Sequence, residues 1–129
     1  MLNKESHVPY IAYINTLAGY VHKRLTDRFE VGVGEASGIF PVEGIGYKKE
    51  YCEPTEKSLA EKGFDHKLKD ILPAVRNAGE KGAVLTEEGA RFLDPEGRLK
   101  AGVPVCPPEG DAGTGMVATD SVLKKTGNI

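Results

Sequence analysis

Apolar residues recur at helical spacing near the start of the chain. Five of them, separated by three or four positions, fall on one face of a helix: Ile11, Ile14, Ala18, Val21 and Leu25. Pro9 suits the first helical turn, where its missing N–H group removes no hydrogen bond. The pattern therefore predicts an amphipathic helix from Tyr10 to Leu25.

The next segment, EVGVGEASGIFPVEGIG, has a different pattern. Its two apolar pieces, Val31–Val33 and Ile39–Val42, are short and partly β-branched, and the glycines between them interrupt a helix. We expect one or two strands here, joined by a glycine-rich polar bend.

Two short elements are expected in the middle of the chain. Pro54 can open a helix that Gly63 closes, with Glu53 and Glu56 near its N-terminal end. The segment KLKDILPAV follows as a short helical or extended piece that Pro73 stops. The charged residues around this piece are expected to form a solvated face.

The last third of the chain alternates again between helix and strand signals. Thr86 is expected to cap a helix whose apolar positions are Ala90 and Leu93. VPVCP predicts a buried strand, GDAGTG a strand-to-helix turn, and MVATDSVLKK the helix that follows. Together, these elements predict a mixed α/β chain that forms a single domain over residues 1–129.

Composition narrows the class of protein. The 129 residues are 40% hydrophobic and 28% charged, which argues against a disordered or fibrous chain. With a net charge of −2 and no long Lys/Arg cluster, nucleic acid is not an expected partner. No apolar run reaches the roughly 20 residues of a membrane span, and MLNKESHVPY lacks the apolar core of a signal peptide. We therefore expect a cytoplasmic protein without a membrane partner.

The cysteines and histidines do not predict a metal site. Cys52 and Cys106 form no C-x-x-C pair and have no histidine at ligand spacing, which favours two buried free thiols. His7 and His66 fall in predicted loops, and His22 falls beside the apolar stripe of the first helix as a partly buried or surface residue. We assign no ligand role to any of them.

Three interpretations of the glycine-rich segment around Asp111 remain open. The glycines can simply allow a tight turn, with Asp111 capping the helix or its loop. A phosphate cradle is disfavoured, because G-x-x-G-x-G matches neither phosphate motif and carries a central carboxylate. Alternatively, the glycines leave Asp111 accessible as a general base that accepts a proton from a substrate hydroxyl.

Four segments resemble, in the same order, the FGGY family of carbohydrate kinases. GVPVCPPEGDAGTGMVATDSVLKKTGN is similar to the region around that family's catalytic aspartate, where G-x-P-V precedes G-D and a helix of small residues. TLAGYVHKRLTDRF resembles the helix that ends in L-T-G, and GEASGIFPVE resembles the D-x-S-x-A-S-like stretch behind it. ILPAVRNAGEKGAVLTEEGARFL resembles the LP-x-V…G-x-L-T-x-E-x-A run. The resemblance extends from about His7 to Asn128 and is greatest for the xylulokinase-like branch.

This resemblance implies a fold, a reaction and a set of site residues. The fold would be part of an actin-like, ribonuclease-H-like α/β architecture, namely the sugar-binding N-terminal lobe. The reaction would transfer the γ-phosphoryl group of ATP to a hydroxyl of a ketose or polyol, with Mg²⁺ in the intact enzyme. Asp111 would be the catalytic base, and the substrate-binding residues would be Glu35, Ser37, Gly110 and Asp111.

The chain also departs from the family pattern. Glu35 stands where Asp is usual and Asp27 where Gly is usual, and neither of the family's two phosphate loops is present. We therefore expect a fragment that needs a missing ATP-binding lobe as its partner, does not bind ATP or Mg²⁺ tightly and is inactive alone. The alternatives are a stand-alone sugar-binding or self-associating module, such as a homodimer, and a complete small protein of unrelated activity.

Two neighbours of Asp111 are expected to have ordinary structural roles. Glu109 could raise the pKa of Asp111 by repulsion, but a solvated position on the loop is favoured. Thr114 is expected to cap the helix that begins near Met116 rather than to bind a ligand.

Overall fold

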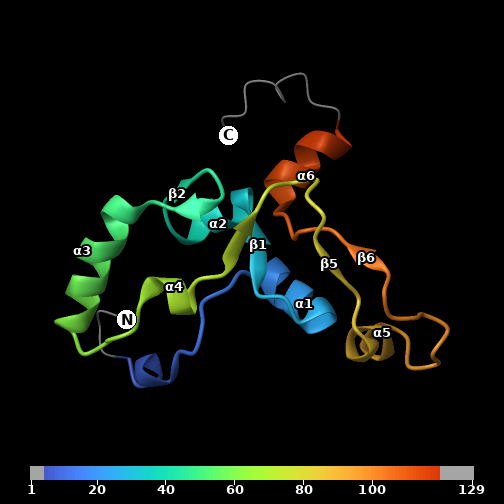
Figure 1. Cartoon of the computed structure of the whole chain (residues 1–129), viewed down its shortest axis with the longest axis horizontal. Coiled ribbons are helices and arrows are strands. Elements are labelled where there is room, and N and C mark those ends of the chain that lie inside the picture. Colours follow the sequence, from blue (N-terminus) through green and yellow to red (C-terminus); the bar gives the residue numbers. More distant parts are fainter. Residues whose placement is uncertain (1–4, 120–129) are drawn as a thin grey trace.

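The fold alternates short helices and short strands around a small central sheet (Figure 1). The computed structural model describes residues 5–119. Its elements are η1 (Val8–Tyr10), α1 (Leu17–Thr26), β1 (Glu30–Gly32), α2 (Val33–Ile39), β2 (Val42–Glu43), β3 (Gly46–Tyr47), α3 (Lys49–Ala60), α4 (Leu68–Ile71), β4 (Ala74–Arg76), β5 (Ala83–Val84), α5 (Glu87–Leu93), β6 (Pro104–Val105) and α6 (Asp111–Ala118). The predicted mixed α/β class is confirmed.

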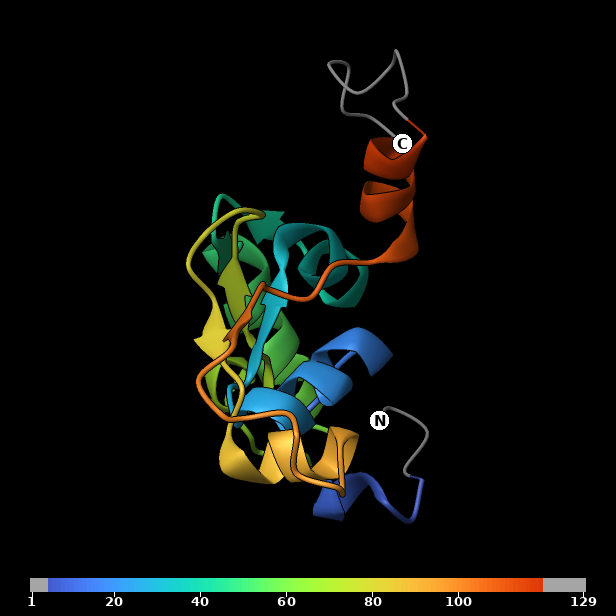
Figure 2. The same ribbon diagram turned by 90° about the vertical axis from the view of Figure 1, so that its right-hand side faces the viewer.

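The strands form three two-stranded sheets. β1 and β4 are parallel, with Val31 opposite Val75, whereas the β2–β3 and β5–β6 pairs are antiparallel. The other edge of β1 is also occupied, because the Gly32 N–H donates to the Pro108 carbonyl at 2.8 Å. This bond brings the segment between β6 and α6 across the end of β1, as Figure 2 shows.

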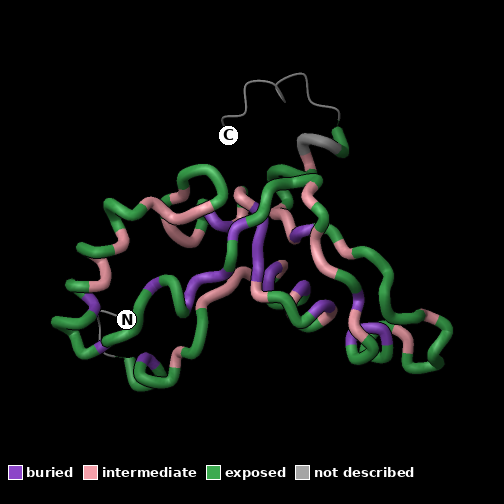
Figure 3. Tube along the Cα trace, viewed as in Figure 1, coloured by how far each residue is buried: buried purple, intermediate pink, exposed green. Residues whose placement is uncertain are grey.

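Two small apolar clusters form most of the core. The larger one lies beneath α3 and α4 and consists of Val8, Leu59, Phe64, Leu68, Ile71 and Leu72. The smaller one joins Val31 of β1 to Ala36 of α2 and Val75 of β4. Buried positions therefore follow the central strands and the inner sides of the helices, and much of the remaining surface is exposed (Figure 3).

The first helix is shorter than predicted, and its apolar stripe is not its buried face. α1 begins at Leu17, because the Thr16 hydroxyl accepts the Gly19 N–H at 3.0 Å, and the Ile14 N–H instead donates to the Ile71 carbonyl. The buried residues of α1 are Gly19, His22 and Thr26, whereas Val21 is 46% exposed. On the face of α1 that packs on β1, Gly19 allows close approach to Val31, and the side chains of His22 and Thr26 are hydrogen-bonded.

A helix replaces the predicted glycine-rich bend. α2 begins immediately after β1, and the predicted Ile39–Val42 strand is reduced to Val42–Glu43. Ala36 is fully buried against Val31 and Val75, which accounts for a helix despite the two glycines of α2, Gly34 and Gly38. Tertiary packing here outweighs the low helix propensity of glycine.

α3 begins earlier than predicted. It starts at Lys49, so Pro54 lies inside the helix rather than in its first turn. Pro54 is exposed, which leaves the carbonyl that loses its bond on the water side of the helix. Gly63 follows the helix with φ +86°, in the left-handed conformation that glycine favours, and its predicted role at the helix end is confirmed.

In the last third of the chain the predicted Thr86 cap is confirmed, but several residues predicted to be buried are exposed. Thr86 caps α5 by accepting the Gly89 N–H at 2.9 Å, but Leu93 is 52% exposed. β6 is not buried, because Pro104 is exposed and its pairing with β5 lies at the surface. Both cysteines are free, but Cys106 is exposed and Cys52 only half-buried, so the predicted burial is wrong.

Candidate functional site

Asp111 is the first residue of α6, the helix that follows the β6 loop. The predicted turn over Gly110–Gly115 is therefore wrong, because the helix starts five residues before Met116. The Asp111 side chain is exposed, and its Oδ1 accepts the N–H of Ala112 at 3.0 Å. The carboxylate is thus held at a helix start and remains open to solvent.

The glycines and the threonine near Asp111 lie within α6. Neither Gly113 nor Gly115 has a positive φ, and an added Cβ at either would meet nothing within 4 Å. Thr114 does not cap the helix, because its hydroxyl donates to the Gly110 carbonyl at 2.9 Å from inside the first turns. Gly115, one helical turn after Asp111, consequently leaves that side of α6 without a side chain, whereas Gly113 lies on another side of the helix.

Glu35 approaches the same turn from α2. A Cβ on Gly110 would lie 2.8 Å from Glu35 Oε1, so the two residues are in contact. Glu35 Oε2 is buried and makes no hydrogen bond within residues 5–119. The structure thereby places three of the predicted site residues together, namely Glu35, Gly110 and Asp111.

Ser37 does not join this group. It lies two residues beyond Glu35 on the same helix, which turns its side chain about 200° away. Its hydroxyl is exposed and donates to the Gly34 carbonyl at 2.7 Å. Ser37 therefore completes a bond within α2 rather than facing Asp111.

Glu109 is the residue whose surroundings sequence reasoning predicted wrongly. It is half-buried against Gly32 and Gly34 rather than solvated, and a Cβ on Gly34 would lie 3.2 Å from its Oε2. Burial, and secondly repulsion from Glu35, raises the pKa of Glu109 above its ordinary value of 4.5. In the sequence, the one signal of this contact is the pair Gly32 and Gly34 at the end of the predicted strand, since glycine in a strand often marks a close approach of another segment.

A mostly apolar hollow lies between Glu109 and α6. Its volume is about 410 Å³, and it is lined by Ala78, Glu109, Gly113, Thr114 and Ala118. This size is within the range of about 300–1,000 Å³ that is usual for small-molecule pockets.

The acidic side chains near Asp111 can also be compared with what a metal ion requires. Within residues 5–119, no three His, Cys, Asp or Glu side chains are grouped so that they could hold a metal ion. The N-terminus of α6, which was considered as a phosphate cradle, presents the carboxylates of Asp111 and Glu35 and no cation among the described residues.

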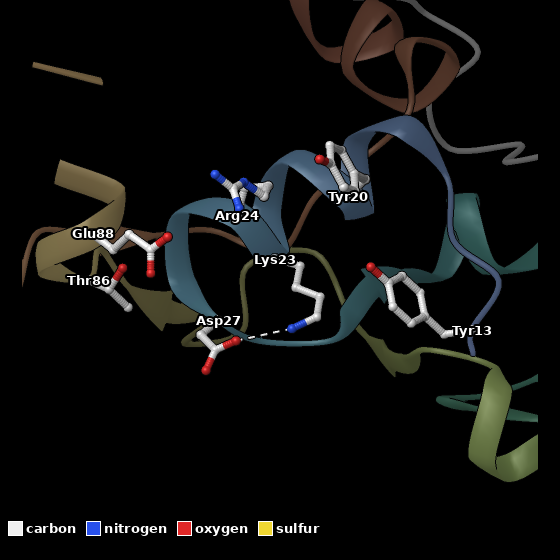
Figure 4. A pocket seen from close by; sticks show the side chains of 7 residues that line it. All are labelled: Tyr13, Tyr20, Lys23, Arg24, Asp27, Thr86 and Glu88. Carbon is white, nitrogen blue, oxygen red and sulfur yellow. Dashed lines mark hydrogen bonds and ion pairs between the residues drawn. The ribbon is translucent and has the colours of Figure 1, made fainter. Parts of the chain in front are cut away.

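A second hollow, of about 450 Å³, lies away from Asp111 along α1 and α5 (Figure 4). Its lining residues are Tyr13, Tyr20, Lys23, Arg24, Asp27, Thr86 and Glu88. Lys23 is paired with Asp27 at 3.0 Å, and Arg24 lies 5.5 Å from the ring centre of Phe92. Because its cations already have partners and no predicted site residue lines it, we place the candidate site at Asp111.

The buried histidine belongs to a structural network. His22 Nε2 lies 3.2 Å from Glu30 Oε1, and the Arg76 Nε donates to Glu30 Oε2 at 2.9 Å. Both His22 and Glu30 are almost fully buried. The network ties α1 to β1 and β4 and takes no part in the Asp111 group.

Within the part that the structure describes, no helix has the length and apolar character needed to cross a membrane.

Comparisons of this chain with protein-family models, with curated proteins and with solved structures gave no match.

Proposed function

We propose that this chain is the sugar-binding part of an FGGY-type carbohydrate kinase of the xylulokinase-like branch. One observation carries the proposal: Glu35 of α2 contacts Gly110 at the base of the exposed Asp111. These residues are far apart in the sequence and come from two different segments that resemble the family. Their contact supports the resemblance beyond the order of the motifs.

Asp111 has the chemistry of a general base in this proposal. Its exposed carboxylate accepts the proton of a sugar hydroxyl, the O–H bond breaks, and the hydroxyl oxygen becomes the nucleophile for phosphoryl transfer. Glu35, whose Oε1 lies toward Gly110 from α2, supplies a carboxylate acceptor for a second hydroxyl. Gly115, one helical turn after Asp111, lets a ketose or polyol approach this side of α6 without a side-chain clash.

Binding of ketoses and polyols to the chain tests this proposal. Amide NMR signals of residues 32–37 and 108–115 should shift on addition of D-xylulose, D-ribulose or ribitol. Glu35→Gln should weaken that binding about tenfold, since it removes a charged acceptor worth about 1.4 kcal/mol. Glu88→Gln, an exposed change on α5, is the matched control and should leave the affinity unchanged.

An assay of ADP release with ATP, Mg²⁺ and the same sugars tests the catalytic part. We expect no turnover by the chain alone, because its sequence contains neither of the two phosphate loops that the family uses to bind ATP. Turnover that disappears in Asp111→Asn would support the reaction but overturn the expectation that another lobe is required. Absence of sugar binding at millimolar concentration would contradict the proposed sugar-binding role.

A self-associating module is the second candidate function, and strongly exposed apolar side chains favour it. Leu17 of α1 is 80% exposed, Tyr10 of η1 85%, and Phe92 of α5 62%. Association with a second copy of the chain would remove such apolar surface from water.

Sedimentation velocity tests the second candidate. A dimer that dissociates in Leu17→Glu and in Phe92→Glu would support it. Ile45→Glu, which changes an exposed apolar residue of the β2–β3 turn, is the control. A monomer at all concentrations would exclude self-association.

A further inference from the structure

The loop before α6 is attached to the β1–α2 junction through two kinds of contact. The Gly32 N–H donates to the Pro108 carbonyl at 2.8 Å. The Glu109 carboxyl lies directly against Gly32, where an added Cβ would overlap Glu109 Oε1 and would lie 2.6 Å from the Pro108 carbonyl oxygen. The contact extends to Gly34, because a Cβ added to Gly34 would lie 3.2 Å from Glu109 Oε2. The junction is thus shaped to receive this carboxyl group.

Among the residues that the structure describes, the attachment brings carboxyl groups together without an ion-paired cation. Glu35 faces the loop from α2 and contacts Gly110, and Asp111 begins α6 directly after the loop. Ala78 is the neighbour from the segment after β4, and the cation of β4, Arg76, is already bonded to Glu30. Within residues 5–119, neither Glu35 nor Glu109 forms an ion pair.

Such an arrangement favours the neutral form of Glu109. A half-buried carboxyl beside a second carboxyl loses hydration and gains repulsion when it ionises. The raised pKa of Glu109, caused first by burial and then by Glu35, agrees with this geometry. Ionisation of Glu109 must therefore weaken its contact with the β1–α2 junction.

We propose that Glu109 is a positioning residue that holds the Asp111-bearing loop on the β1–α2 junction when protonated and loosens the loop when ionised. The inference rests on the proposed function only in the role given to Asp111. The attachment itself is a property of this chain, independent of any substrate. Because Asp111 follows Glu109 by two residues, the protonation of Glu109 sets how firmly Asp111 is positioned.

An NMR pH titration of the full chain tests the inference. Between about pH 4 and about pH 9, the carboxyl ¹³C signal of Glu109 and the amide signals of Gly32, Gly34 and Gly110 should share one midpoint. That midpoint should lie above the ordinary glutamate value of 4.5. Glu109→Gln should abolish the shared amide titration and hold the three signals at their low-pH positions.

Two further variants separate the causes. Glu35→Gln should move the Glu109 midpoint toward 4.5, because it removes the facing carboxylate. Glu88→Gln on α5 is the matched control and should leave the midpoint unchanged. A purely structural role of Glu109 would predict a stability loss in Glu109→Gln without a change in this pH profile.

The outcome distinguishes this inference from the proposed function. A Glu109 signal that titrates at 4.5, or glycine amides that titrate identically in Glu109→Gln, would overturn the inference. If Glu109→Gln does not fold, the carboxyl signal of the unmodified chain still decides the point. A shared midpoint without any sugar binding would support the attachment and count against the sugar-binding role alone.

Discussion

Gly32 has a structural role that follows from its surroundings. It ends β1, it is buried, and its missing side chain makes room for the Pro108 carbonyl and the Glu109 carboxyl. Its backbone N–H also bonds to that carbonyl at 2.8 Å. A single residue thus determines whether the loop that carries Asp111 can lie against β1.

Gly32→Ala should separate the loop from β1. The new Cβ would overlap backbone as well as side-chain atoms, so we expect a loss of about 1–3 kcal/mol in the free energy of unfolding. Urea unfolding of the variant and of the unmodified chain measures this loss. Gly38→Ala, in α2 where an added Cβ meets nothing within 4 Å, is the control and should stabilise by about 0.5–1 kcal/mol. Equal effects of the two variants would contradict the role given to Gly32.

The sequence pattern predicted the roles of Thr86 and Gly63 correctly and that of Glu109 wrongly. Thr86 as a helix cap and Gly63 after a helix are local features, and both were predictable because their partners lie within a few residues. Glu109 was predicted to be solvated, because its burial depends on Gly32 and Gly34 in a distant segment. The error therefore concerned a non-local contact.

At the scale of elements, α5 is fixed by its cap and by its attachment to α1. Thr86 accepts the Gly89 N–H at 2.9 Å, and both its N–H and its hydroxyl donate to the Leu25 carbonyl at the end of α1. Gly89 is buried against the backbone of Leu25. The two helices are therefore joined through close backbone contact as well as through the Arg24–Phe92 side-chain contact.

Thr86→Ala should weaken both the cap and this joint. We expect a loss of about 1–2 kcal/mol in the free energy of unfolding, as is usual for a helix N-cap. Thermal or urea unfolding provides the measurement. Ser37→Ala removes an exposed hydroxyl that bonds only within α2, and it should cost less than about 0.5 kcal/mol. A neutral Thr86→Ala would show that α5 does not depend on its cap.

At the scale of the whole molecule, a buried polar network links elements that are distant in sequence. Glu30 of β1 receives one bond from His22 of α1 and one from Arg76 of β4. With an apolar core split into two small clusters, this network contributes to the packing between helix and sheet. The central parallel pair therefore depends on polar as well as apolar contacts.

Glu30→Ala should destabilise the entire fold. It leaves His22 buried without its partner and removes the counter-charge of Arg76, so we expect a loss of about 2–3 kcal/mol. The expected loss is moderate because the Arg76 side chain is 45% exposed and can be hydrated. Glu43→Ala, at an exposed position of β2, is the control. Chemical denaturation that gives equal midpoints for the two variants would exclude a structural role of the network.

The stability of the molecule should also depend on pH through Glu109. Since its pKa is raised in the folded chain, the folded state binds the proton more tightly than the unfolded state. Its contribution is fully present below the ordinary value of 4.5 and is lost as the pH rises through the folded pKa. Glu109→Gln should abolish this decline in the urea midpoint.

Glu56 provides a control of opposite sign. Its pKa is lowered, first by the Leu68 N–H and then by Lys67, so its contribution is present above 4.5 and lost as the pH falls. Glu56→Gln should remove an acid-side loss of stability and leave the decline above 4.5 in place. A wild-type urea midpoint that stays flat above 4.5 would contradict the role of Glu109.

By itself, the sequence determined the mixed α/β class, the Thr86 cap and the helix end before Gly63, and it suggested Asp111 as a candidate base, which stays a prediction. The first three depend on local backbone preferences, and the last on the resemblance of short motifs. Only the tertiary structure decided that GEASG is helical, that His22 is buried and that Glu35 and Glu109 meet the Asp111 loop. These features depend on contacts between segments distant in the chain, and no local pattern encodes which buried surface a residue will face.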